Sequence, residues 1–224
     1  MPKLRKYGTC FFEQYAQIEL SSLLGSEFDD LLGRDRPDLQ SKENGRLGIE
    51  VTRAMEESRK AATQLLKDVS GIAPAAERRE MEQIVESGYA YGLRDGKYVG
   101  VKELEYWTLA LPLRKILVSK IAKVGSGFYG HFEKMGLFVF CKDNLTEADA
   151  AKTCRFVLRQ QRELEIRYNR LYLADIDELF VCNLDDGISF DARVLTIPVS
   201  QAQRKSFFLQ AVHRQLDGRT PMSR

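Results

Sequence analysis

Two short segments decide the fold: Arg36-Pro37-Asp38-Leu39-Gln40 and Gly48-Ile49-Glu50-Val51-Thr52. Asp38 lies where a turn leads into a strand, and Glu50 lies inside an apolar strand. The polar spacer between them carries Asn44-Gly45, a strong hairpin signal, so the hairpin can bring the two carboxylates together. Two adjacent carboxylates repel each other unless a positive charge lies between them, and a hard divalent cation such as Mg²⁺ prefers such ligands.

This pattern resembles the signature of the PD-(D/E)XK nuclease superfamily, whose members have the restriction-endonuclease-like fold. Asp38, preceded by proline, matches the first acid of that motif, and Glu50 matches the second. Thr52 stands where the motif has lysine. The resemblance implies that Asp38 and Glu50 bind Mg²⁺ or Mn²⁺ and that Thr52 takes the place of the catalytic lysine. It covers about residues 11–184, apart from an insertion.

The resemblance also implies further site residues. An acid on the first helix completes the metal site in many members, and Glu19 is the candidate, with Glu13 as a competitor. A lysine from elsewhere can replace the missing one; Lys60 is the nearer candidate and Lys120 is another. In the alternative reading Asp38 is a turn residue, Glu50 pairs with an arginine across the hairpin, and the remaining charges are solvated.

A cluster of arginines suggests where a phosphate backbone could bind. Arg155, Arg159 and Arg162 follow one another at helical spacing, and guanidinium groups suit phosphate recognition. The alternative is a solvated helix face, partly balanced by Glu163 and Glu165. The net charge of only +2 predicts that any nucleic-acid-binding surface is local.

Length and patterning predict an α/β protein with a restriction-endonuclease-like core, a central mixed β-sheet flanked by helices, and a helix plus hairpin insertion. The 224 residues suit one nuclease-like domain over 1–199, with the insertion at about 71–111 and a C-terminal helix and tail over 200–224. Apolar periodicity predicts helices at 11–24, 55–69, 75–87, 113–124, 146–168 and 203–216. Strands are expected at 37–39, 47–52, 135–141, 171–174, 179–184 and 192–199, and a hairpin at 89–102.

One glycine-rich segment needs a separate interpretation. Residues Gly125-Ser126-Gly127-Phe128-Tyr129-Gly130 match G-x-G-x-x-G. The segment follows a predicted helix and precedes a strand, which is the reverse of the dinucleotide-binding order. We therefore expect a helix end and a loop here.

The remaining features narrow the class of protein. The four cysteines are scattered, which argues against a zinc site and suggests a reducing compartment. The N-terminus lacks the apolar run of a signal peptide, and no apolar stretch is long enough to span a membrane. We expect a cytoplasmic, metal-dependent phosphodiesterase acting on nucleic acid, DNA or RNA. The alternatives are a catalytically inactive protein of this fold that binds nucleic acid or a protein partner, and a structural or interaction protein in which the insertion forms a homodimer contact.

Overall fold

The computed structural model describes residues 11–43, 45–54, 93–94, 97–98, 111–141, 145–175, 177–186 and 193–217. The predicted helices at 55–69 and 75–87, Lys60, and most of the predicted insertion lie outside these residues. The described elements, in chain order, are α1 (Phe11–Leu24), the 3-10 helix η1 (Ser26–Phe28), β1 (Leu31–Gly33), β2 (Leu39–Ser41), β3 (Leu47–Ala54), β4 (Leu93–Arg94), β5 (Lys97–Tyr98), α4 (Leu111–Gly125), β6 (Lys134–Cys141), α5 (Glu147–Gln160), β7 (Arg170–Ala174), β8 (Glu178–Asn183), β9 (Val194–Pro198) and α6 (Gln201–Asp217).

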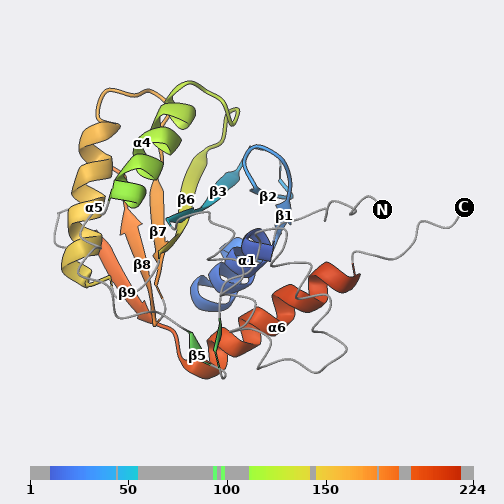
Figure 1. Cartoon of the computed structure of the whole chain (residues 1–224). Coiled ribbons are helices and arrows are strands. Elements are labelled where there is room, and N and C mark those ends of the chain that lie inside the picture. Colours follow the sequence, from blue (N-terminus) through green and yellow to red (C-terminus); the bar gives the residue numbers. More distant parts are fainter. Residues whose placement is uncertain are drawn as a thin grey trace, which may run out of the picture.

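A seven-stranded mixed sheet forms the centre of the molecule, in the order β1-β2-β3-β6-β7-β8-β9 (Figure 1). Strands β3, β6 and β7 run parallel, and each remaining neighbouring pair is antiparallel. The α/β class and the mixed sheet flanked by helices are therefore confirmed. The separate β4–β5 pair brackets Asp95-Gly96, as expected of the hairpin predicted there.

Helices cover both faces of the sheet. On one face, α1 and α6 pack against alternate residues of the strands, among them Ile49, Phe138 and Tyr172. On the other face, α4 and α5 pack against the intervening residues, including Leu137 and Val139. Figure 1 shows α4 and α5 on one side of the sheet and α1 and α6 on the other. Strand β6 is buried on both faces, as its continuous apolar run predicts.

Helix α5 begins where the sequence predicts but ends earlier. Thr146 caps it, accepting a hydrogen bond from Asp149 N while the Asp149 side chain accepts one from Thr146 N, which is a capping box. The predicted helix to Tyr168 is wrong, because α5 ends at Gln160. The Gln161 side chain bonds both backbone groups of Tyr168, at 2.8 and 3.1 Å, and so turns the chain back towards β7.

Strand β1 is also a departure from the sequence prediction. A loop is expected between α1 and Asp38, but Leu31–Gly33 pairs antiparallel with β2. The segment is only three residues long, too short for its periodicity to be recognised.

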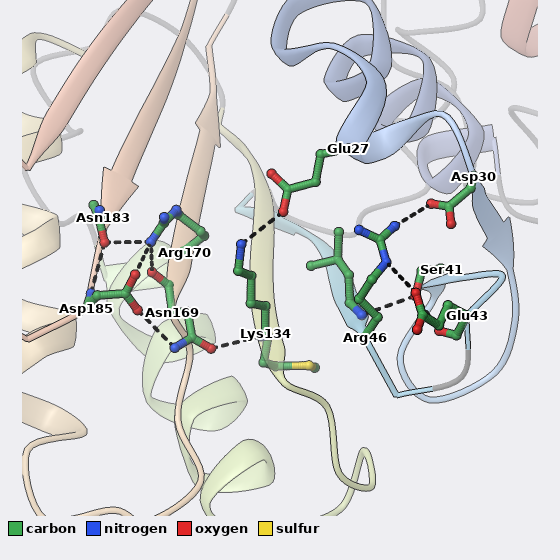
Figure 2. Close-up of polar contacts among 12 residues, drawn as sticks. Glu27, Asp30, Ser41, Glu43, Arg46, Lys134, Asn169, Arg170, Asn183 and Asp185 are labelled. Carbon is green, nitrogen blue, oxygen red and sulfur yellow. Dashed lines mark hydrogen bonds and ion pairs between the residues drawn. The ribbon is translucent and has the colours of Figure 1, made fainter.

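Charged side chains join the segments around the amino ends of the parallel strands (Figure 2). Lys134 Nζ lies 3.1 Å from Glu27 Oε1, and Arg46 lies 2.9 Å from Asp30. Beside β7, Arg170 contacts Asp185 at 2.7 Å. These pairs are at least partly exposed, so they orient the surrounding loops more than they stabilise the fold.

Candidate functional site

The β2–β3 hairpin places Asp38 and Glu50 side by side, as their spacing predicts. Leu39 pairs with Ile49 and Gln40 with Gly48. Continuing this antiparallel register by one residue sets Asp38 opposite Glu50, and side chains directly opposite in such a pair share a face. The backbone N–H of Val51 donates a hydrogen bond of 2.8 Å to Asp38 Oδ2, which holds the aspartate against β3.

The Glu50 side chain lies on the α4 face of the sheet. Its neighbours Ile49 and Val51 belong to the core beneath α1, and side chains alternate along a strand. In the parallel register Glu50 lies beside Leu137, which packs under α4 and α5. Glu50 is therefore a buried carboxylate on a strand in the interior of the sheet.

Lys120 supplies the positive charge of the site. Its Nζ lies 2.5 Å from Glu50 Oε1, with side-chain exposures of 17% for the lysine and 9% for the glutamate. Helix α4 brings it there, because buried Leu117 and Ile121 on either side of Lys120 anchor the helix on the sheet. Lys120 is one of the two lysines that the sequence offers in place of the motif lysine, and the structure brings it, from 70 residues away, to Glu50.

The pKa of Asp38 reflects this crowding. Burial, and next the charge of Glu50, raise the pKa of Asp38 from its ordinary 3.8 to about 7. The Val51 N–H and the Lys120 ammonium act in the opposite direction, without balancing the rise. Two carboxylates therefore share one ammonium group, and the site attracts further positive charge.

Two buried tyrosines complete the surroundings of Glu50. Burial, and next the charge of Glu50, raise the pKa of Tyr129. Its hydroxyl lies near Glu50 and Tyr168 but has no hydrogen-bond partner of good geometry in the described chain. The Tyr168 hydroxyl donates to Lys120 O at 3.3 Å. Sequence reasoning missed both residues, because the glycine-rich segment that contains Tyr129 indicates only a helix end and a loop, and Tyr168 stands in no recognisable motif.

Gly48 lets the Pro37 loop approach β3. A Cβ at this position would lie 2.8 Å from Pro37 Cγ, which is closer than real Cβ atoms come, and 3.0 Å from the Phe132 ring, which is a tight contact. The Arg36–Pro37 peptide is cis, and Arg36 has a φ of 63°. The Gly48 at the start of the quoted strand is thus needed for close packing beside Asp38.

The structure does not join the other predicted metal ligand to this pair. Glu19 is buried in α1, whose apolar face packs on the opposite side of the sheet from α4. Burial raises the pKa of Glu19 to about 8, and its Oε2 has no hydrogen-bond partner in the described part of the chain. The competing Glu13 lies in the first turn of the same helix.

The remaining predicted residues lie in three different places. Thr52 shares the Glu50 face of β3 by alternation and is partly exposed. Lys60 lies outside the described residues. Arg155, Arg159 and Arg162 are all exposed, but Arg162 follows the end of α5 and does not continue its face.

Asp38 and Glu50 supply part of the oxygen ligands that a hard cation needs. Both side chains offer carboxylate oxygens, and burial, with next the charge of Glu50, raises the pKa of Asp38. Within the described ranges no cluster of three or more His, Cys, Asp or Glu side chains forms a ready-made metal site. Two carboxylates with several waters are nevertheless the usual mode of Mg²⁺ binding, so the pair fits this ion.

Two further findings complete the description. No helix in the described segments is long and apolar enough to cross a membrane. Comparison with protein-family models, with curated proteins and with solved structures finds no match to this chain.

Proposed function

We propose that the protein is a metal-dependent phosphodiesterase that cleaves nucleic acid. The observation that carries the proposal is the joining of Asp38, Glu50 and Lys120, from a hairpin and a distant helix, at one partly buried site. Two carboxylates and an ammonium group are the residue types that hydrolysis of a phosphodiester by a PD-(D/E)XK nuclease requires. The resemblance seen in the sequence and this geometry therefore support the same chemistry.

The order of elements supports the same assignment. The resemblance to the restriction-endonuclease-like fold implies a helix, hairpin strands and a helix, followed by a strand, a helix and a strand. Helix α1, strands β1 to β3, α4, β6, α5 and β7 follow one another in this order. Glu50 would stand on the third of these strands and Asp38 just before the second. We propose on this basis that the α/β domain is a relative of that fold.

Each residue has a distinct role in the proposed reaction. Asp38 and Glu50 would hold Mg²⁺ or Mn²⁺, which when bound offsets phosphate charge and acidifies water. Lys120 would orient the attacking water and stabilise the negative charge that develops on the phosphoryl group, the role expected of the motif lysine. Thr52, on the same face, would hydrogen-bond to water. Tyr168 would position Lys120 through its backbone carbonyl.

The test compares variants that preserve shape and remove charge. Wild-type protein is incubated with single- and double-stranded DNA and RNA in Mg²⁺, Mn²⁺ or a chelator, and cleavage is followed on denaturing gels. Glu50→Gln and Lys120→Met should each lower the cleavage rate by about 10²- to 10⁴-fold, as expected for loss of a charged catalytic group. Lys115→Met, at an exposed position on the same helix, is the matched control and should cleave normally.

The Glu50–Lys120 pair also favours a second candidate. In a catalytically inactive protein of this fold, Lys120 would replace the metal as the partner of Glu50, and the domain would bind nucleic acid or a protein without cutting. That candidate predicts no cleavage under any condition and no rise in melting temperature with Mg²⁺ or Mn²⁺. Cleavage by Glu50→Gln at the wild-type rate would reject the proposed site.

A further inference from the structure

The loop after α4 carries two adjacent aromatic residues, Phe128 and Tyr129, on a turn with a defined backbone. Phe128 N donates to Lys123 O at 3.2 Å, and Gly127 N donates to Val124 O at 3.0 Å. With Gly127 at a φ of +72°, these two bonds form a Schellman motif that ends the helix. The G-x-G-x-x-G segment is therefore a helix end and a loop, as its position in the sequence predicts.

The two aromatic residues of this loop have opposite environments. Tyr129 is buried and its ring points towards the Glu50 site, whereas the Phe128 side chain is 45% exposed. Their rings meet edge to face at 5.3 Å, so the buried ring supports the exposed one. The exposed Phe128 ring therefore stands on a well-anchored turn, where a ligand can reach it.

Two cations flank the exposed ring. Arg36 Cζ lies 5.3 Å from the ring centroid of Phe128, and Lys123 Nζ lies 5.2 Å from it. Arg36 is 59% exposed and stands in the left-handed region at a φ of 63°, which an arginine adopts only where its surroundings hold it. Arg36 Nε also lies 3.3 Å from Asp35 Oδ2, but both side chains of this pair are exposed and solvent screens it. Arg36 and Lys123 are both long side chains, so their charged ends can turn from the ring to a nearby anion.

This aromatic and basic cluster, Phe128 with Arg36 and Lys123, directly adjoins the candidate catalytic site. Arg36 stands two residues before Asp38, Lys123 lies one helical turn after Lys120, and Phe128 precedes Tyr129. Each member is thus held by an element that also holds a site residue. The Phe128 ring therefore stands beside the elements that hold Asp38 and Glu50.

We propose that this cluster is a binding subsite for single-stranded nucleic acid, in which a base stacks on Phe128 and Arg36 and Lys123 contact the flanking phosphates. The proposal rests on the proposed function for its choice of nucleic acid. An exposed ring beside basic groups is the combination that single-strand-binding surfaces use. Paired bases inside a duplex are already stacked on both sides, so only an unpaired base or a frayed end can offer its face to the ring.

Binding without metal tests the subsite separately from cleavage. Fluorescence anisotropy in a chelator compares an unstructured labelled oligonucleotide with the duplex of the same sequence, in DNA and RNA forms. Phe128→Leu should weaken single-strand binding by about 5- to 150-fold, because one base–aromatic stack contributes roughly 1–3 kcal/mol. Duplex binding should change little. Phe128→Trp should restore the affinity, because tryptophan also stacks on bases.

Two further measurements use independent signals. A 2-aminopurine base in the oligonucleotide should lose fluorescence on binding to the wild type and recover it with Phe128→Leu. The double variant Arg36→Ala with Lys123→Ala should reduce the log–log salt slope by about 1.4, at roughly 0.7 for each phosphate contact on a single strand. Leu195→Ala, at an exposed position on β9, is the matched apolar control and should bind normally.

The outcomes separate this inference from the proposed function. Equal single-strand binding by wild type and Phe128→Leu overturns the subsite, as does equal loss of single-strand and duplex binding, or failure of the wild type to bind any nucleic acid. Single-strand binding that depends on Phe128, in a protein that cuts nothing, supports the subsite and rejects the phosphodiesterase. The comparison of DNA with RNA identifies the preferred strand.

Discussion

At the scale of single residues, the central feature is a shortage of positive charge. Lys120 lies against Glu50, while Asp38 depends on one backbone N–H and on the more distant effect of Lys120. Burial and the neighbouring Glu50 charge raise the pKa of Asp38 to about 7, so this carboxyl changes protonation near neutral pH. Protons and metal ions therefore compete for the same place.

The raised pKa of Asp38 predicts how stability changes with pH. The folded protein binds the Asp38 proton more tightly than the unfolded chain, so this residue's stabilising contribution is complete below about pH 3.8 and is lost as pH rises to about 7. Asp38→Asn removes this dependence while its amide oxygen keeps the Val51 bond. The variant should match the wild type near pH 4 and be more stable at pH 8, by up to about 4 kcal/mol at 1.36 kcal/mol per pKa unit.

Urea unfolding of both proteins at a series of pH values measures the difference. Mg²⁺ provides a second readout, because an ion that binds Asp38 should stabilise the wild type at pH 8 and leave Asp38→Asn unchanged. A stability difference that is constant from pH 4 to 8 would show that Asp38 is not held in the surroundings described here.

At the scale of elements, short-range packing decides whether the site assembles. The β2–β3 register sets Asp38 opposite Glu50, but the loop before Asp38 can approach only because position 48 has no side chain. Helix α4 contributes Lys120 from its buried side, and its terminal turn contributes Phe128. One helix thus serves both the proposed chemistry and the proposed substrate contact.

Gly48→Ala should damage the site through this contact. The added methyl group would collide with Pro37 and Phe132, and overpacking of this kind usually costs about 1–3 kcal/mol. Movement of the Pro37 loop should also carry Asp38 away from Glu50 and weaken Mn²⁺ binding in isothermal titration. Gly136→Ala, whose methyl group would meet Tyr172 at 3.0 Å, is the control: it should lose stability and keep its Mn²⁺ affinity.

The arginines of α5 give a second prediction at this scale. If Arg155, Arg159 and Arg162 contact a duplex backbone, changing all three to alanine should flatten the log–log salt dependence of binding by about two to three units, at roughly 0.9 per phosphate. Because Arg162 lies beyond the helix end, Arg155→Ala with Arg159→Ala should account for most of the change. An unchanged slope in anisotropy titrations would mean that this surface is only solvated.

At the scale of the whole molecule, two helical layers enclose one sheet. The predicted boundary at residue 199 falls just before α6, yet Phe207, Phe208 and Ala211 of this helix join the same buried cluster as α1 and the sheet. Arg204 of α6 donates to Val199 O at 2.7 Å and pairs with Asp177. The C-terminal helix therefore helps to cover the sheet face opposite the site.

Removal of the α6 contact should destabilise the entire fold. Phe208→Ala deletes a buried ring, which typically costs about 3–5 kcal/mol. Because the ring belongs to the shared core, circular dichroism and intrinsic fluorescence should show one common transition at lower urea. Lys205→Ala, at an exposed position on the same helix, should unfold like the wild type. Separate transitions would indicate that 200–217 folds as an independent unit.

Much of the local structure was predictable from the sequence. The bounds of α1, the strand at Glu50, the buried β6 and the capped start of α5 follow from periodicity and capping residues, which act over a few positions. The pairing of Asp38 with Glu50 was also predictable, because a tight hairpin sets the register of its two strands. The early end of α5 was not predictable from the sequence, because it depends on a contact between the Gln161 side chain and the backbone of Tyr168.

By itself, the sequence determined the two acids of the candidate site and the strands that carry them. It could do so because successive side chains of a strand alternate between the two faces of the sheet. Only the tertiary structure decided which lysine meets Glu50, which tyrosines surround it, and that Glu19 lies under the opposite face. Those contacts join residues distant in sequence. They depend on how each helix packs on the sheet, and packing is set by the buried side chains of the whole core rather than by any local repeat.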